Sequence, residues 1–446
     1  MKKILVIGAG RSSTSLIKYL LENSEKEQWK VTVVDFNVDL ALKKTNKHPN
    51  SFTSKLDANN DEERRTFIAN ADIVISMLPA RMHFKVLKDC VEFGIHVITP
   101  SYITDEIKLL NSDALEKDVL VLNELGLDPG VDHMSAKKMI DDVQSKGGKL
   151  IGFESFTGGL VAPESDNNPW NYKFTWNPRN VVLAGQGGAA KFIQEGKYKY
   201  IPYNKLFRRT EIIEIDDFGK FEGYANRDSL KYRSIYGLQN IPTMYRGTLR
   251  RVGFCRAWNI FVQLGLTDDS YIIEGSENMT NRDFINSFLR FNTNDSVELK
   301  LRHYLRIEQD DYIWDKLIWL GLFENKKIGI KNATPAKMLQ KILEEKWTLQ
   351  KEDKDMIVMW HKLNYTINNK HFKLISHMEY VGKDADYTAM SDTVGLPLGI
   401  AAKMVLNEKI KSRGVLLPTE KEIYASVLEE LETYGVKFKE ELTQVT

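Results

Sequence analysis

The chain has little cysteine, no excess of either charge and no long apolar run. Its 446 residues include only two cysteines, Cys90 and Cys255, which lie far apart in the sequence. Two separated cysteines exclude a disulfide framework and a cysteine-rich metal centre, and they suit a reducing compartment. We therefore expect a cytoplasmic protein without a metal site.

The balance of charge excludes further classes of partner. Lysine and arginine total 62 and aspartate and glutamate total 61, which gives a formal net charge of +1. Such a chain has no overall field that would attract nucleic acid or an anionic membrane. No apolar stretch approaches the roughly 18 residues of a membrane span. We expect neither nucleic acid nor a membrane as a partner, so bound anions must meet local clusters of cations.

What is present is the composition of an ordinary globular protein. Hydrophobic residues make up 42% of the chain and charged residues 28%, as in typical soluble domains. A length of 446 residues exceeds what one hydrophobic core accommodates, so two or three domains are expected.

The N-terminal residues predict a dinucleotide-binding unit. Residues 3–7 are an apolar strand, residues 8–13 read Gly-Ala-Gly-Arg-Ser-Ser, and a helix follows to about residue 22. A second strand, residues 31–35, ends in Asp35. Glycines let the backbone approach a pyrophosphate at the helix N-terminus, and an acid at the end of the second strand bonds the ribose hydroxyls.

Two details of this motif affect the choice of cofactor. Ser13 stands where the third glycine of the pattern is usual, which leaves the fingerprint incomplete although serine is small enough to pack closely. Asp35 would repel a 2′-phosphate and therefore favours NAD. Arg11, inside the loop, could partly offset that repulsion.

Strands and helices then alternate as far as residue 122. Apolar strands at 73–79, 96–102 and 119–122 are separated by helical segments at 62–70, 82–93 and 104–117. This alternation predicts an α/β fold with a parallel sheet, which binds ligands at the carboxyl ends of its strands. The polar residues at those ends are Ser76, Ser101, Tyr102 and the run Glu124–Asp128.

Residues 123–133 (Asn-Glu-Leu-Gly-Leu-Asp-Pro-Gly-Val-Asp-His) are the most unusual segment. They follow an apolar strand and precede a helical pattern that begins at Ser135. A strand that ends in acids, glycines and a proline presents its side chains on a turn. We expect this turn to join a cofactor domain to a substrate domain; the alternative is an ordinary turn with capping aspartates.

After about residue 149 the regular alternation of strands and helices ends. Strand-like stretches are expected at 150–157, 181–184 and 211–215, and helices throughout about 277–350. Two strands, 356–367 and 371–381, should form a hairpin at Asn368-Asn369, and a helix rich in small residues should span about 387–408. A basic cluster contains Arg227, Arg233, Arg246, Arg250, Arg251 and Arg256.

Five blocks of sequence resemble saccharopine reductase, the glutamate-forming saccharopine dehydrogenase of lysine metabolism. They are residues 123–133, 158–165 (Gly-Gly-Leu-Val-Ala-Pro-Glu-Ser), 168–176, 226–229 (Asn-Arg-Asp-Ser) and 246–250 (Arg-Gly-Thr-Leu-Arg). Residues 387–390 and 413–416 continue the match, so the resemblance spans essentially the whole chain.

The resemblance implies a reaction and a domain plan. Members of this family reversibly oxidise saccharopine with NADP or NAD to glutamate and 2-aminoadipate 6-semialdehyde, through an imine. The implied fold has a variant Rossmann domain, an α/β substrate and dimerisation domain with a mixed sheet, and a third, mainly helical domain; the protein should be a homodimer. We place these domains at residues 1–130 plus about 385–420, about 131–270 plus 350–384, and about 271–349.

The resemblance also carries over site residues. It implies that Asp128 holds the secondary amine and that Tyr102 donates to a carboxylate or a water, which makes these two the catalytic candidates. The implied substrate contacts are Ser101, Tyr102, Asp128, Arg227, Thr248, Leu249 and Arg250. The implied cofactor contacts are Gly8, Gly10, Arg11, Ser12, Ser13, Asp35, Asp57, Ser76, Ser101, Leu127 and Trp176.

One residue departs from the family pattern, and alternative functions stay open. Thr157 stands where the family commonly has cysteine, so no thiol can transfer a proton there. His133 is a candidate base that is also readily explained as structural. A related reductase of another amino-acid or polyamine imine, such as a carboxynorspermidine-forming enzyme, should lack Arg227 and the 248–250 block. A non-catalytic nucleotide-binding regulator should lack Asp128 and these arginines.

Overall fold

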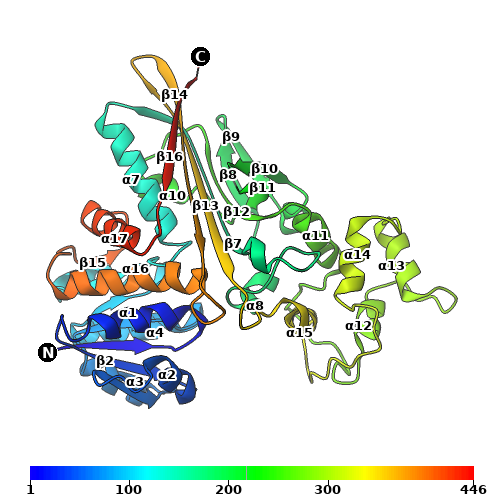
Figure 1. Ribbon diagram of the computed structural model, residues 1–446, viewed down its shortest axis with the longest axis horizontal. Helices are drawn as coiled ribbons and strands as arrows, with labels where there is room; N and C mark the ends of the chain where they lie inside the picture. Colours follow the sequence, from blue (N-terminus) through cyan, green and yellow to red (C-terminus); the bar gives the residue numbers. More distant parts are fainter. Residues whose placement is uncertain (217, 446) are drawn as a thin grey trace. The chain divides into compact units, whose positions relative to one another are not determined.

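The computed structural model describes residues 1–216 and 218–445. The chain has an α/β fold, which confirms the predicted class. It forms two compact units (Figure 1). The first unit contains Met1–Leu150, Ile235–Gly237 and Leu363–Thr446, and the second contains Ile151–Ser234 and Leu238–Lys362. The division into three domains stays a prediction.

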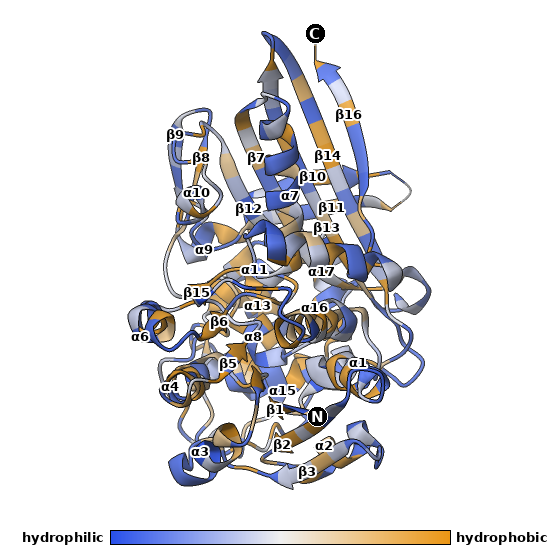
Figure 2. Ribbon diagram, turned by 90° about the vertical axis from the view of Figure 1, so that its left-hand side faces the viewer, coloured by the Kyte–Doolittle hydropathy of each residue, from blue (hydrophilic) through white to orange (hydrophobic). Residues whose placement is uncertain are grey.

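A seven-stranded parallel sheet is the core of the first unit. Its strand order is β15-β6-β5-β4-β1-β2-β3. Inner strands such as β4 and β6 are short, mainly apolar runs (Figure 2) whose residues are all buried, as helices on both sides of a sheet require. The order reverses between β1 and β4, and ligands bind at such a point. The strands are β1 (Lys2–Ile7), β2 (Trp29–Asp35), β3 (Ser51–Lys55), β4 (Ile73–Ser76), β5 (His96–Ile98), β6 (Leu120–Leu122) and β15 (Gly414–Leu416).

Helices cover this sheet. The segment expected as one helix at 104–117 is two short helices, α5 and α6, and the helix expected from Ser135 begins four residues earlier, at Val131. The helices of this unit are α1 (Thr14–Asn23), α2 (Val38–Thr45), α3 (Asp61–Ala69), α4 (His83–Phe93), α5 (Asp105–Lys108), α6 (Asn111–Glu116), α7 (Val131–Ser145), α16 (Ala389–Leu406) and α17 (Lys421–Thr433).

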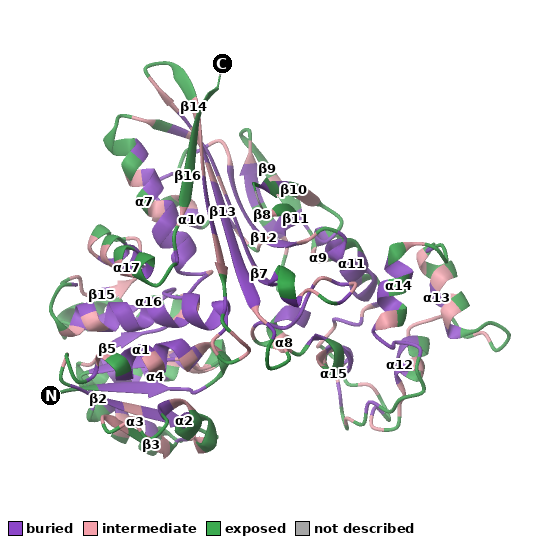
Figure 3. Ribbon diagram, viewed as in Figure 1, coloured by how far each residue is buried: buried purple, intermediate pink, exposed green. Residues whose placement is uncertain are grey.

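Helix α16 returns the C-terminal part of the chain to this sheet. It packs on α1 (Figure 1) and on β4, and β15 then pairs in parallel with β6. Although the sequence contains no uninterrupted apolar run of that length, α16 is long and apolar enough by composition to cross a membrane. Of this helix, 78% is buried within the protein (Figure 3), as in a core helix.

A second sheet is mixed, and most of its strands belong to the second unit. Within it, β12 (Met244–Arg251) pairs in parallel with β7 (Lys149–Val161) and antiparallel with β11 (Gly219–Ala225). The hairpin predicted at Asn368-Asn369 is confirmed, because both asparagines have positive φ between β13 and β14. The remaining strands of the mixed sheet are β8 (Ala190–Gln194), β9 (Lys197–Ile201), β10 (Thr210–Ile215), β13 (Asp355–Ile367), β14 (Lys370–Val381) and β16 (Lys439–Val445).

The helices of residues 151–362 surround an aromatic core. Trp170, Trp258 and Trp347 are fully buried together there. The strand predicted at 181–184 is wrong: Asn177 caps a short helix whose first residue is Pro178, a position that proline favours. The helices are α8 (Pro178–Val182), α9 (Tyr203–Leu206), α10 (Tyr232–Ile235), α11 (Phe254–Leu264), α12 (Asn281–Ser287), α13 (Val297–Leu305), α14 (Tyr312–Trp319) and α15 (Pro335–Trp347).

Candidate active site

The glycine loop between β1 and α1 fits a pyrophosphate. Gly8 has φ of 109°, and a Cβ on it would lie 2.9 Å from the Met77 carbonyl oxygen, so only glycine suits this position. Gly10 is exposed, and the short 3-10 helix Arg11–Ser13 leads into α1. The loop thus leads from β1 into a helix N-terminus, with one glycine required by its φ and one exposed; binding of a pyrophosphate there stays a prediction.

Asp35 ends β2 next to this loop. One oxygen of its carboxylate accepts from the Ala9 amide at 2.6 Å and the other from the Asn37 amide at 2.7 Å. The acid thus ties the glycine loop to the end of β2. Each carboxylate oxygen has a second lone pair, which leaves capacity for ribose hydroxyls.

Lys44, on α2, is a candidate that the sequence analysis missed. Its ammonium donates to the Gly10 carbonyl oxygen and, at 3.1 Å, to the Ser13 hydroxyl. Burial lowers the pKa of Lys44 to about 8, against the opposing charges of Asp386 and Asp35. A cation in this loop favours an anionic ligand. The signal was the helix itself, which has Asn37 as N-cap and lysines in its last turn.

Two of the predicted cofactor contacts make local hydrogen bonds of their own. The Ser76 hydroxyl, at the buried end of β4, lies 2.9 Å from Nδ1 of His83, which is also 3.2 Å from the Thr99 hydroxyl. Burial lowers the pKa of His83 to about 4. Asp57, after β3, accepts from the Asn59 amide at 2.9 Å and shapes the turn before α3.

The turn after β6 presents Asp128. Asp128 is the one residue of the fully described stretch 119–136 that is not buried. Gly130 allows this, because its φ is 150° and a Cβ on it would overlap the backbone of Gly126. The Leu127 side chain is 5% exposed. The turn therefore buries its own backbone and leaves one carboxylate accessible.

The two catalytic candidates contact each other. The Tyr102 hydroxyl donates to Oδ1 of Asp128 at 3.2 Å. Both side chains are half-buried, and Ser101 beside Tyr102 is also partly exposed. Since Tyr102 follows β5 and Asp128 follows β6, they lie at the same carboxyl edge of the parallel sheet as the glycine loop.

Arg250, on β12, is a buried cation among aromatic rings. It is 5% exposed, and its guanidinium lies 5.2 Å from the Tyr172 ring centre and 5.5 Å from that of Phe254. It donates to the Leu249 carbonyl at 2.8 Å, and its Nε has no hydrogen-bond partner in the described part of the chain. No ion pair joins it to a carboxylate of the described residues. A buried cation of this kind suits a ligand carboxylate.

The other predicted residues of the second unit lie on or after several of its elements. Thr248 is opposite Thr157 in the β12–β7 register, and Thr157 is 5% exposed. Arg227 is exposed, with φ of 47°, two residues after β11 ends. Trp176 is half-buried in the loop before α8. The assignment of individual ligand contacts to these residues stays a prediction.

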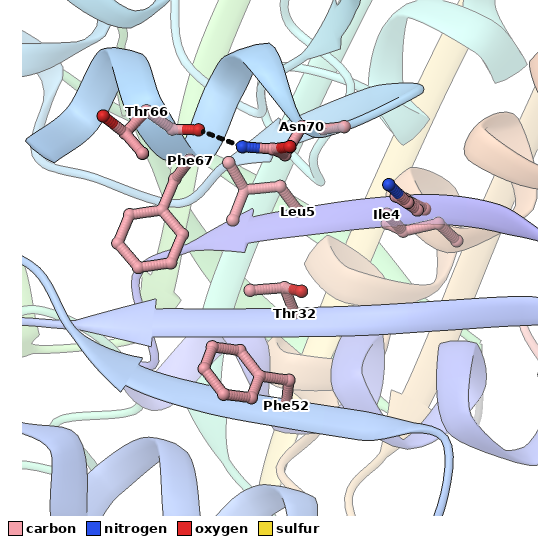
Figure 4. Close-up of a pocket in the computed structure, with 9 residues that line it drawn as sticks. Ile4, Leu5, Thr32, Phe52, Thr66, Phe67 and Asn70 are labelled. Atoms are coloured by element: carbon pink, nitrogen blue, oxygen red, sulfur yellow. Dashed lines mark hydrogen bonds between the residues drawn. The ribbon is translucent and has the colours of Figure 1, made fainter.

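A groove on the first unit contains none of these candidates. Figure 4 shows it between β1, β2, β3 and the end of α3, where Asn70 donates to the Thr66 carbonyl at 2.8 Å. Its apolar lining residues include Leu5, Phe52 and Phe67. Among residues 1–216 and 218–445, no group of three or more His, Cys, Asp or Glu could hold a metal ion.

Known proteins resemble both halves of the chain. A family model described as "Saccharopine dehydrogenase NADP binding domain" matches residues 4–122, and one described as "Saccharopine dehydrogenase C-terminal domain" matches residues 126–436. Mitochondrial alpha-aminoadipic semialdehyde synthase of Mus musculus is 32% identical over 453 residues, which cover 99% of this chain and 48% of that protein. This chain thus spans about half the length of that relative.

Relatives of the same length also match. Saccharopine dehydrogenase [NADP(+), L-glutamate-forming] of Schizosaccharomyces pombe is 30% identical over 452 residues, 99% of each chain. The solved structure of apo saccharopine dehydrogenase (L-Glu forming) from Saccharomyces cerevisiae superimposes with a TM-score of 0.89 at 31% identity, covering 99% of this chain and 100% of that one.

Proposed function

Because the chain belongs to the saccharopine dehydrogenase family, we propose that it catalyses the NAD(P)-dependent, reversible oxidation of L-saccharopine to L-glutamate and 2-aminoadipate 6-semialdehyde. The observation that carries this proposal is the buried guanidinium of Arg250, which has no carboxylate partner in the described chain. Saccharopine has three carboxylates, and a planar guanidinium binds such groups with two parallel hydrogen bonds.

The residues divide the chemistry between them. A bound nicotinamide supplies the hydride acceptor for the carbon beside the saccharopine nitrogen. In this proposal Asp128 holds the ammonium group of the substrate, and Tyr102 orients that carboxylate, a role supported by their 3.2 Å hydrogen bond. The ammonium first loses one proton to solvent, and loss of the hydride from the neighbouring carbon then gives a protonated imine. Water adds to the imine carbon, and breakage of the C–N bond leaves the amine on glutamate and the aldehyde on the other product.

Purified protein with saccharopine and either oxidised cofactor tests the proposal. Reduced nicotinamide should appear, and glutamate and the semialdehyde should form in equal amounts. Absence of turnover with both cofactors would contradict the assignment. Arg250→Lys should raise KM for saccharopine by roughly 10- to 100-fold, because lysine lacks the two-pronged donor geometry and one charged hydrogen bond contributes about 1.5–3 kcal/mol. Its effect on cofactor affinity should stay within about twofold, since Arg250 is proposed to contact the substrate and not the cofactor.

We infer further that this chain accepts NAD at least as well as NADP. The support is Asp35, whose carboxylate lies at the ribose end of the glycine loop and would repel a 2′-phosphate. Lys44 and Arg11 are the nearby cations that oppose this repulsion. The names of the family model and of the fungal relatives contain NADP. An assay that compares NAD with NADP therefore tests this inference directly.

Asp35→Asn tests the cofactor choice. Removal of the charge should shift the ratio of NADP to NAD affinity toward NADP by at least roughly fivefold, because two unit charges about 4 Å apart repel by about 1 kcal/mol even in water. The ratio is the measurement, by titration calorimetry, because the variant also loses one of the two backbone hydrogen bonds of Asp35. An unchanged ratio would show that Asp35 acts only on the loop.

We also propose a cytoplasmic homodimer. The support is the resemblance, together with two buried free cysteines that suit a reducing compartment. Light scattering on the purified protein measures the oligomeric state, and a monomer at micromolar concentration would contradict the dimer.

A further inference from the structure

We propose that Glu124 is a positioning residue for Tyr102, and that a hydrogen-bonded chain through His133 to Tyr236 holds Glu124 in place. The proposal rests on the proposed function, because it gives Tyr102 a task in saccharopine binding. It explains why a turn that presents Asp128 also contains a buried glutamate.

Glu124 bonds the backbone on both sides of Tyr102. Its amide donates to the Ser101 carbonyl at 3.0 Å, and its Oε1 accepts from the Ile103 amide at 3.0 Å. Tyr102 is thus held between two hydrogen bonds to a single residue. Because the Tyr102 hydroxyl then reaches Asp128 at 3.2 Å, the position of Glu124 fixes the distance between both catalytic candidates.

The second oxygen of Glu124 leads to a buried chain of polar groups. Its Oε2 lies 2.9 Å from Nε2 of His133, and Nδ1 of His133 lies 2.5 Å from the Tyr236 hydroxyl. An ionised Glu124 accepts from Nε2–H, which leaves Nδ1 of a neutral imidazole to accept from the tyrosine. Tyr236 is 103 positions away in sequence from His133 and belongs to the same compact unit as Glu124 and His133.

Burying a carboxylate costs free energy, so the burial of Glu124 calls for an explanation. Glu124 is 1% exposed and His133 is 0% exposed. A buried carboxylate is stable only when its oxygens are hydrogen-bonded, and both oxygens of Glu124 are. Its φ is 56°, a backbone conformation that costs non-glycine residues energy and that surrounding contacts must maintain. A plain turn would not need a buried acid in this conformation.

The first test compares two substitutions of Glu124. Glu124→Ala removes both side-chain acceptors and should lower kcat/KM for saccharopine on the order of 10- to 100-fold, as misplacement of a reacting group by about 1 Å does. Glu124→Gln keeps an oxygen for the Ile103 amide and should recover most of that loss. Cofactor affinity, measured by fluorescence titration with reduced nicotinamide, should change less than about threefold in both variants, because the glycine loop is untouched.

A double-mutant cycle separates positioning from a general structural role. If Glu124 acts through Tyr102, Glu124→Ala should cost little further kcat/KM in a Tyr102→Phe background. Independent, multiplying losses would overturn the proposal. So would an equal loss of saccharopine and cofactor affinity, or full activity in Glu124→Ala.

Two tyrosines that bond residues of α7 provide a milder test with a matched control. Tyr236→Phe removes the hydroxyl that bonds His133 near the start of α7, whereas Tyr424→Phe removes one that bonds Asp141 of the same helix at 2.7 Å. Tyr236→Phe should raise KM for saccharopine by roughly three- to tenfold, the effect of one neutral hydrogen bond of about 1 kcal/mol. Tyr424→Phe should leave it unchanged, and equal effects would contradict the proposed role of the polar chain.

Wild-type protein is assayed first, so that the two ideas fail separately. No turnover of saccharopine by the wild type would refute the proposed function. Turnover by the wild type with unchanged kinetics in Glu124→Ala and Tyr236→Phe would refute the positioning role alone.

Discussion

His83 shows how one buried side chain makes stability depend on pH. It is 2% exposed, it bonds Ser76 and Thr99, and burial lowers its pKa to about 4 from 6.5. The folded protein therefore keeps His83 neutral while the unfolded chain protonates it below about pH 6.5. Between these two pKa values the unfolded state binds more protons, so the free energy of unfolding falls as the pH is lowered.

We expect acid to destabilise the protein through His83 between about pH 6.5 and 4. The difference between the pKa values of 6.5 and about 4 corresponds to about 3 kcal/mol of stability. All of it is retained above pH 6.5 and lost near pH 4. Urea unfolding at several pH values measures the slope. His83→Gln should flatten the slope in this range even if it lowers stability overall, and an unchanged slope would assign the acid sensitivity to other groups.

The glycine loop shows how an element's conformation depends on its neighbours. The motif alone places glycines at 8 and 10, yet the structure gives them different tasks. Gly8 lies against the Met77 carbonyl with positive φ, whereas a Cβ on Gly10 would have nothing within 4 Å. The fold thus requires glycine at position 8, whereas position 10 has room for a side chain.

Alanine substitutions should separate these tasks. Gly8→Ala should lower the free energy of unfolding by about 1–3 kcal/mol, the cost of a strained backbone conformation. Gly10→Ala, the matched control, should leave the stability of the ligand-free protein within about 0.5 kcal/mol and weaken cofactor binding instead. Thermal unfolding with and without cofactor distinguishes them; equal destabilisation by both would contradict the assignment.

The first unit is assembled from segments that are far apart in the chain. The sequence predicted a small-residue helix near 387–408, and α16 lies against α1 (Figure 1). The small residues are needed there, because a Cβ on Gly395 would lie 2.7 Å from the Leu16 amide nitrogen. The hydroxyls of Ser15 and Tyr380 both donate to Asp392 at this interface, the latter at 2.8 Å.

Gly395→Ala tests this close packing. Alanine favours a helix by about 1 kcal/mol, but overpacking against a backbone atom costs about 1–3 kcal/mol, so a net loss of stability is expected. Calorimetric unfolding measures the change. A gain in stability would mean that α1 and α16 are not in such close contact.

Local patterns in the sequence specify several parts of this fold. Apolar runs of strand length and glycine and asparagine turns are properties of short segments, so they predict the parallel sheet, the glycine loop and the hairpin at Asn368-Asn369 directly. The same reasoning fails at the helix 178–182, because Val181 and Val182 favour a strand while the cap at Asn177 and Pro178 decides otherwise.

Only the tertiary structure decided which side chains meet. Four features depend on packing between distant segments. They are the burial of the residues around Asp128, the position of Arg250 among aromatic rings, the contact of Lys44 with the glycine loop and the hydrogen bond between His133 and Tyr236. His133 and Tyr236, for example, are 103 positions apart. Periodicity and turn chemistry act over a few neighbouring residues, whereas these contacts exist only after distant segments have folded against one another.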